Sequence, residues 1–165
     1  MNRNLVAKSA VSINARASRV WDALVTPSEI KQYMFGADAE SGWAEGSRIV
    51  WRGEWQGKRY EDKGRILTVD PERTLVFSHF GPLSGQPDTP EQAHTVTIDL
   101  SEIGATTLVT LSHDNVLTEE ARTHAQDSWD EMLSRLKQFV EARTTQLIPR
   151  RLRTTIRRPH RKAAT

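Results

Sequence analysis

The final helical segment of the sequence constrains the fold more than any other feature. From Thr118 to Arg143 the apolar residues follow each other at steps of four, four, three, one, three, three and one, which places them on one helical face. Thr118 is a suitable N-cap, followed by two glutamates in the first turn. About 26 residues at 1.5 Å each span about 39 Å, enough to cross the face of a sheet. The apolar positions are Ala121, Ala125, Trp129, Met132, Leu133, Leu136, Phe139 and Val140.

The segment before this helix alternates with the period of β-strands. Turn signals such as "SGWAEG", "QG", "DPER" and "GA" separate six strand-like stretches. Residues 5–14 alternate in the same way and predict one more strand at the start of the chain. The six stretches read "ADAE", "SRIVWRGEW", "KRYEDKGRILTV", "RTLVFSHF", "HTVTIDLSEI" and "TTLVTLSHDN".

Two short helices are predicted between the first strand and the other six. Ser18 is the expected N-cap of "RVWDALV", in which Val20, Trp21 and Leu24 have helical spacing. Pro27 begins the second helix, with Thr26 as its expected cap, and Gly36 ends it.

This order of elements predicts an α+β fold. The chain order is one strand, two short helices, six further strands and the long C-terminal helix. The strands are expected to form one curved antiparallel sheet of about seven strands that wraps around this helix. That helix is the only predicted element able to cover one whole face of the sheet. A strongly curved sheet closed by one helix does not close perfectly, so we expect a cavity between them.

Composition narrows the classes of protein. The 165 residues suffice for one domain with a core, and 37% hydrophobic with 27% charged residues is typical of a globular protein. No apolar run has the length of a membrane span, and the first residues lack a signal-peptide pattern, so a cytoplasmic location is expected. The absence of cysteine excludes disulfides and thiolate catalysis.

The charge distribution divides the chain into a predicted domain, residues 1–144, and a basic C-terminal tail, residues 145–165. The tail holds seven of the 23 basic residues and none of the 21 acidic ones, so residues 1–144 carry a net charge of −5. Such a tail is either a solvated, disordered segment or a contact for an anionic partner, namely a membrane surface, a nucleic acid or an acidic protein.

Strand parity predicts which side chains face the long helix. On residues 48–55 the apolar set includes Trp51 and Trp55, whereas the alternate positions are mostly polar. Extending this alternation to the other strands and to the helix gives a candidate ligand-binding set. It comprises Trp51, Trp55, Tyr60, Asp62, Ile66, Phe77, His79, Ile98, Leu111, His113, Trp129, Met132, Leu133 and Leu136.

This inward set has two interpretations. It forms a plain hydrophobic core, or its large rigid aromatics and few polar groups line a small-molecule pocket. Asp62, His79 and His113 are its polar members, and a buried Asp or His is costly unless it is paired. They lie either solvated at an open rim or directed at a ligand.

Evidence for catalysis or for a cofactor is weak. His79 and Asp62 are the candidate acid–base pair, provided that the fold brings them together. No P-loop, dinucleotide fingerprint, nucleophile elbow or zincin motif is present, and the five histidines lack metal-ligand spacing. We therefore expect no metal and no cofactor, and the chain is more readily interpreted as a binding protein than as an enzyme.

Three stretches of the sequence resemble the START-like, or SRPBCC, superfamily with its helix-grip, Bet v 1-like fold. They are "SINARASRVWDALVTPSEIKQYMFG", "GSRIVWRGEWQGKRYEDKGRILTVDPERTLVFSHF" and "HAQDSWDEMLSRLKQFVEA", and the resemblance covers about residues 5–142. Within the superfamily the chain is similar to the activator of Hsp90 ATPase homologue-like branch. The basic tail lies outside the resemblance.

The resemblance implies a hydrophobic ligand, such as a lipid, a polyketide or an aromatic compound, held between sheet and helix. Two alternatives stay open: an enzyme of cyclase or hydrolase type using His79 and Asp62, and a chaperone-accessory or stress-response protein using the basic tail. The resemblance also implies that the loop of residues 81–92 lies near the cavity mouth. The sequence predicts neither the ligand nor the oligomeric state.

Overall fold

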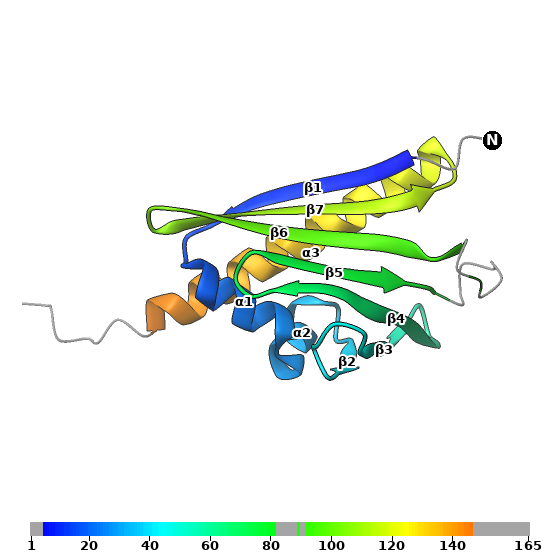
Figure 1. The fold of residues 1–165 in the computed structure, drawn as a ribbon, viewed down its shortest axis with the longest axis horizontal. Helices are drawn as coiled ribbons and strands as arrows, with labels where there is room; N and C mark the ends of the chain where they lie inside the picture. The colour runs from blue at the N-terminus through cyan, green and yellow to red at the C-terminus, as the bar shows by residue number, and fades with distance from the viewer. Residues whose placement is uncertain (1–4, 82–88, 90–91, 147–165) are drawn as a thin grey trace, which may run out of the picture.

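The predicted order of elements is confirmed in the computed structural model, which describes residues 5–81, 89 and 92–146, the last three by their backbone alone. Helices and strands are segregated along the chain as expected for an α+β protein (Figure 1). The elements are β1 (Leu5–Ile13), α1 (Ala17–Val25), α2 (Pro27–Tyr33), β2 (Asp38–Ser41), β3 (Arg48–Trp55), β4 (Lys58–Asp70), β5 (Thr74–His79), β6 (His94–Ile103), β7 (Thr106–Val116) and α3 (Glu119–Gln146).

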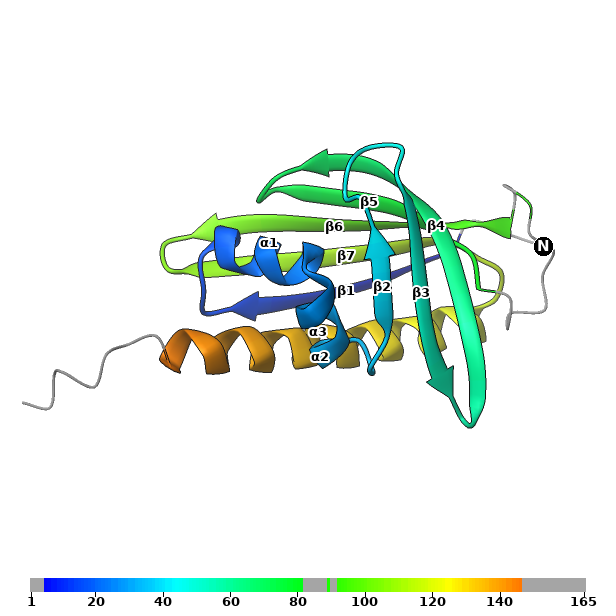
Figure 2. The same cartoon turned by 90° about the horizontal axis from the view of Figure 1, so that it is seen from below.

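The seven strands form one antiparallel sheet in the order β1-β7-β6-β5-β4-β3-β2. Six consecutive strands make a meander, and β1 joins it at the edge of β7. The long helix α3 runs along one side of this sheet (Figure 2). The helix-grip architecture expected from the resemblance is therefore observed.

The sheet bends most strongly along β4. A Cβ atom on Gly64 would lie 1.7 Å from the backbone oxygen of Ser78, so only glycine permits this close approach of β4 and β5. The register then shifts between Ile66 and Thr68, which marks a bulge. Beyond the bend, the β3–β4 hairpin projects away from the rest of the sheet (Figures 1 and 2). This bend creates the concave face on which the cavity lies.

The helix α3 is fastened along the edge strand β1 by polar contacts. The hydroxyl of Ser9 donates a hydrogen bond to the carboxylate of Asp130. About two helical turns further along α3, the Lys137 ammonium donates to the backbone oxygen of Ser12 at 2.7 Å. Along the same side of α3, buried apolar side chains belong to the hydrophobic core, namely Met132, Leu133, Leu136 and Val140.

The helix α1 begins two residues earlier than predicted, so Ser18 lies inside the first turn and is not the N-cap. Arg16 occupies the cap position and makes no side-chain capping bond. The backbone N–H of Ala17 instead donates to the carboxylate of Glu102 at 3.0 Å. A residue 85 positions away satisfies the helix N-terminus, which local sequence patterns do not show. The side chain of Thr26 also makes no capping bond at α2.

A buried contact and an ion pair hold the two short helices against each other. The Tyr33 hydroxyl donates to the backbone oxygen of Ala23 at 2.7 Å in a fully buried position. The guanidinium of Arg19 binds both carboxylate oxygens of Glu29, at 2.7 and 3.2 Å. Burial and, to a smaller extent, the negative charge of Glu29 raise the pKa of Tyr33. The C-terminal end of α2 is thus fixed next to the cavity.

The predicted capping of the last helix is confirmed, since the hydroxyl of Thr118 accepts a hydrogen bond from the backbone N–H of Ala121 at 3.0 Å. The helix extends to Gln146, two residues past the predicted domain boundary, and residues 147–165 of the basic tail lie outside the described part of the chain. None of the described helices is both long and apolar enough to cross a membrane.

Candidate ligand-binding cavity

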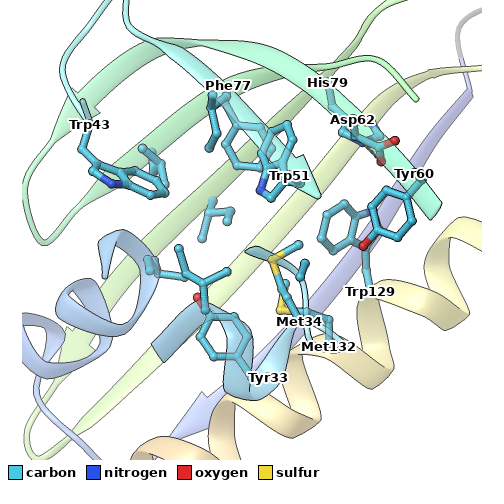
Figure 3. Close-up of a pocket in the computed structure, with 16 residues that line it drawn as sticks. Tyr33, Met34, Trp43, Trp51, Tyr60, Asp62, Phe77, His79, Trp129 and Met132 are labelled. Atoms are coloured by element: carbon cyan, nitrogen blue, oxygen red, sulfur yellow. Dashed lines mark hydrogen bonds and ion pairs between the residues drawn. The ribbon is translucent and has the colours of Figure 1, made fainter. Parts of the chain in front are cut away.

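A cavity of about 90 Å³ lies between the concave face of the sheet and the two helices α2 and α3 (Figure 3). Most of its wall is apolar, and six of its sixteen lining residues are aromatic apart from histidine. The full lining consists of Leu24, Ile30, Tyr33, Met34, Ala37, Trp43, Ile49, Trp51, Tyr60, Asp62, Leu75, Phe77, His79, Ile98, Trp129 and Met132.

Strand alternation brings the sheet residues of this wall to one face. On β3, Ile49 and Trp51 are buried while Arg48 and Arg52 are exposed. The same alternation on β5 directs Leu75, Phe77 and His79 inward. The rings of Trp51 and Phe77 meet at a centroid distance of 5.3 Å, tilted by 50°, and form the aromatic part of the wall.

Eight of the fourteen candidate residues predicted from the sequence line the cavity. Asp62 and His79, the polar candidates on β4 and β5, are among these eight. The eight are Trp51, Tyr60, Asp62, Phe77, His79, Ile98, Trp129 and Met132.

The prediction that Trp55 belongs to the inward wall is wrong. Its side chain is 53% exposed and packs edge-on against Phe35, which is itself 39% exposed. Trp55 has the inward parity, but it lies at the end of the projecting β3–β4 hairpin, where no helix covers it. The alternation of side chains shows which face of a strand a residue lies on. It does not show how far along the strand the helices cover that face.

Five other candidates lie on the inward face but do not line the cavity. Ile66, Leu111, Leu133 and Leu136 are buried in the solid part of the core. His113 also lies outside the wall, and its Nδ1 accepts a hydrogen bond from the indole Nε1–H of the wall residue Trp129 at 2.8 Å. For these positions the plain-core interpretation holds.

Sequence reasoning missed eight residues of the wall. Ile49 and Leu75 share the parity of the predicted set, so the signal for them was present. The others come from the two short helices and the segments that follow them, whose orientation no pattern in the sequence revealed. These are Leu24, Ile30, Tyr33, Met34, Ala37 and Trp43.

The candidate pair Asp62 and His79 is in contact. The distance from His79 Nε2 to Asp62 Oδ2 is 2.8 Å, and the two side chains are 26% and 21% exposed, respectively (Figure 3). His79 Nδ1 is buried and has no hydrogen-bond partner in the described structure. A proton on Nδ1 would be an unsatisfied buried donor, at a cost of about 1–3 kcal/mol. The tautomer with its proton on Nε2 avoids this cost, and its Nε2–H donates to Asp62.

Two further histidines, on the neighbouring strands β6 and β7, form a row of rings with His79. His94 stacks near His79 at a centroid distance of 6.4 Å, and His113 lies 4.4 Å from His94. Burial, followed by the nearby His94 and His79, lowers the pKa of His113 to about 3. His113 is thus neutral near pH 7, which fits the acceptor role of its Nδ1 toward Trp129.

The described residues contain no group of three or more His, Cys, Asp or Glu side chains that could hold a metal ion. Of the loop at residues 81–92, predicted to lie near the cavity mouth, residues 82–88 and 90–91 lie outside the described part of the chain. The groups of the wall that a ligand can contact are mainly aromatic faces, two thioethers and one Asp–His pair.

A family model for activator of Hsp90 ATPase homolog 1-like protein matches residues 14–141. The chain belongs to this family. The predicted branch is thereby confirmed over almost the whole folded region, and the basic tail lies outside the match. No curated protein shows a significant match.

Solved structures agree with membership of the Hsp90 ATPase activator homolog family. A protein from Cytophaga hutchinsonii is 48% identical, with 88% of this chain and 99% of that chain covered and a TM-score of 0.76. The Aha1 dimer from Colwellia psychrerythraea is 19% identical, covering 83% and 96%, with a TM-score of 0.66. CalU16 from Micromonospora echinospora is 21% identical, covering 87% and 88%, with a TM-score of 0.62. The last two similarities show a common fold.

Proposed function

We propose that this protein binds a hydrophobic, ring-containing small molecule in the cavity between the sheet and α3. The observation that carries the proposal is an internal cavity whose wall is built from aromatic and thioether side chains with one polar pair at its edge. Few convergent polar groups in an apolar pocket are typical of small-molecule sites. A core selected for packing alone has few voids larger than a water molecule.

The size of the cavity limits the ligand. An apolar cavity of about 150 Å³ takes benzene, and pockets for drug-sized ligands have about 300–1,000 Å³. At about 90 Å³, this cavity is smaller than both. Any ligand with a ring the size of benzene therefore requires the cavity to widen, and a lipid or polyketide requires it to widen further. Met34, Trp43 and Trp129 are partly buried wall residues, and the flexible Met34 side chain can re-pack at low cost.

Native mass spectrometry of the full chain, purified without added ligand, tests the proposal. Ala37 is 1% exposed and lines the cavity, so Ala37→Leu fills the binding space. Ala10 lies exposed on β1 and provides the matched control, Ala10→Leu. We expect a bound small molecule on the wild type and on Ala10→Leu, and its loss from Ala37→Leu. Equal retention by both variants, with both folded, places the ligand elsewhere and contradicts the proposal.

The contact between Asp62 and His79 favours a second candidate function, proton transfer to or from a bound ligand. In this arrangement Nε2 is already bonded to Asp62, and Nδ1 is enclosed without a partner. A proton acceptor must be reached by the ligand, so binding is the function that the geometry supports better. Recovered ligand that is chemically converted by the wild type and left intact by His79→Gln would establish the enzymatic alternative.

A further inference from the structure

The charge of the cavity wall indicates which class of ligand the cavity binds, and this inference rests on the proposed binding function. Among the described residues that line the cavity there is no lysine or arginine, and Asp62 is the only carboxylate. The neighbouring charged residues of β4, Glu61 and Lys63, have the opposite parity and are exposed on the outer face. The interior therefore presents one acidic group and no fixed cation.

The imidazole of His79 contacts one oxygen of this acid. Its Nε2–H donates to Oδ2 of Asp62, and its buried Nδ1 lacks the acceptor that a second ring proton would need. The hydrogen bond stabilises the ionised carboxylate. Asp62 is thus a hydrogen-bonded carboxylate at the edge of an apolar wall.

The second oxygen of Asp62 accepts no hydrogen bond from the described residues. Within the described structure, Asp62 accepts a hydrogen bond from His79 alone, through Oδ2. Oδ1 faces Gly81, on which a Cβ atom would lie 3.3 Å away, so the absence of a side chain at this position avoids a tight contact with the oxygen. A carboxylate oxygen in such a position accepts a hydrogen bond most strongly from a charged donor.

The aromatic side chains of the wall also favour a positively charged group. The faces of aromatic rings carry negative electrostatic potential and attract cations within about 6 Å. Trp51 lies 5.3 Å from the His79 ring between centroids, and Tyr60 lies two residues from Asp62 on the same face of β4. Burial and then the negative charge of Asp62 raise the pKa of Tyr60.

We infer that the cavity selects ligands in which an aromatic ring carries a protonated amine, with the ammonium group at Asp62 Oδ1 and the ring among the aromatic side chains. A neutral ligand of the same shape lacks the ionic contact, and an anionic one is repelled by a carboxylate with no counter-ion in the wall. The inference makes Asp62 a specificity-determining residue.

Three ligands of matched shape test this selectivity on the full chain: 2-phenylethylamine, 2-phenylethanol and phenylacetate. Titrations are made by calorimetry at low salt and about pH 7.5, above the ordinary pKa of histidine. We expect the amine to bind at least about tenfold more tightly than the alcohol, and the carboxylate to bind most weakly. An amine that binds no better than the alcohol overturns the inference and leaves the binding function standing. Binding of none of the three contradicts both.

Asp62→Asn separates the role of charge from the role of structure, since asparagine can still accept from His79. We expect the preference for the amine to fall below about twofold while the affinity for the alcohol changes little. Asp99→Asn is the control, because Asp99 is an exposed aspartate on β6 that bonds Thr74 outside the cavity. Equal weakening of all three ligands by Asp62→Asn, or a preserved amine preference, overturns the inference.

Discussion

The indole of Trp129 on α3 donates a hydrogen bond to Nδ1 of His113 on β7 at 2.8 Å, and this contact joins the closing helix to the sheet beside the cavity. The bond requires an unprotonated Nδ1. It is compatible with the neutral ring alone, because a protonated imidazole has no free acceptor. The attachment of α3 to β7 is therefore coupled to the charge of His113.

This coupling predicts a loss of stability in acid. The pKa of His113 falls from 6.5 to about 3 on folding, so the unfolded chain binds a proton below pH 6.5 that the folded chain does not. The contribution of His113 is fully present above about pH 6.5 and is lost as the pH falls toward 3, at about 1.4 kcal/mol per unit.

Denaturant unfolding of the wild type and of His113→Gln near pH 7.5 and 4.5 checks this prediction. Glutamine can accept the bond from Trp129 and does not titrate. Between pH 7.5 and 4.5, we expect the free energy of unfolding to fall by about 2–3 kcal/mol more in the wild type than in the variant. Equal acid losses in both proteins would show that His113 is not the responsible group.

The two tryptophans of β3 should differ sharply when each is replaced by alanine. Trp51 is 5% exposed and contacts Phe77 and His79, so Trp51→Ala should lower the free energy of unfolding by about 3–5 kcal/mol. Trp55 is an exposed residue at the hairpin end, and Trp55→Ala should cost less than about 1 kcal/mol. Similar losses, measured by chemical denaturation, would contradict the placement of Trp55 outside the wall.

The bend in β4 should depend on Gly64. A Cβ atom there would overlap the backbone oxygen of Ser78, and a backbone atom cannot rotate away, so Gly64→Ala should destabilise by about 3 kcal/mol or more. Gly42→Ala is the control, because its Cβ would meet only the Ser47 side chain at 3.1 Å. Thermal melts that show equal effects would argue against the close approach of β4 and β5.

The N-terminus of α1 should be sensitive to a distant glutamate and insensitive to its own serine. Removal of the carboxylate that accepts from Ala17 N, by Glu102→Ala, should cost about 1 kcal/mol. Ser18→Ala should change stability by less than about 0.5 kcal/mol, since Ser18 does not occupy the cap position. A larger effect of Ser18→Ala would restore the capping role that the sequence predicts.

Period-2 alternation was sufficient to predict much of the sheet side of the cavity. It placed Trp51, Phe77 and His79 on the inward face, and the structure has them in the wall. It also turned Asp62 inward, although a carboxylate contradicts the expectation of an apolar face. The pattern works because alternate side chains of a strand point to opposite faces whatever the register.

The contact between Asp62 and His79 depends on register, which alternation does not give. It follows from the pairing of β4 with β5, where Lys63 forms a bridge with Phe80 and the ladder shifts between Ile66 and Thr68. The bend at Gly64 sets this pairing through a tertiary contact. From the sequence, Asp62 and His79 were a candidate pair only if the fold brought their two strands together.

The helical side of the wall was harder to predict, because α2 has only seven residues and ends where the chain leaves the helix. Met34 follows it with φ of −99°, and Trp43 lies in a turn with a positive φ of 55°. Side chains in such segments follow no period. Their place in the wall results from tertiary packing against the core, which only the folded structure shows.

The central claim, that a small molecule occupies the cavity, is tested most directly by NMR titration of the full chain with neutral 2-phenylethanol, observed at the indole N–H groups. Trp51 and Trp129 line the cavity, and Trp55 is an internal control outside it. We predict saturable shifts of the Trp51 and Trp129 signals and an unchanged Trp55 signal. Shifts at Trp55 alone, or no saturable shift at Trp51 and Trp129, would contradict the claim.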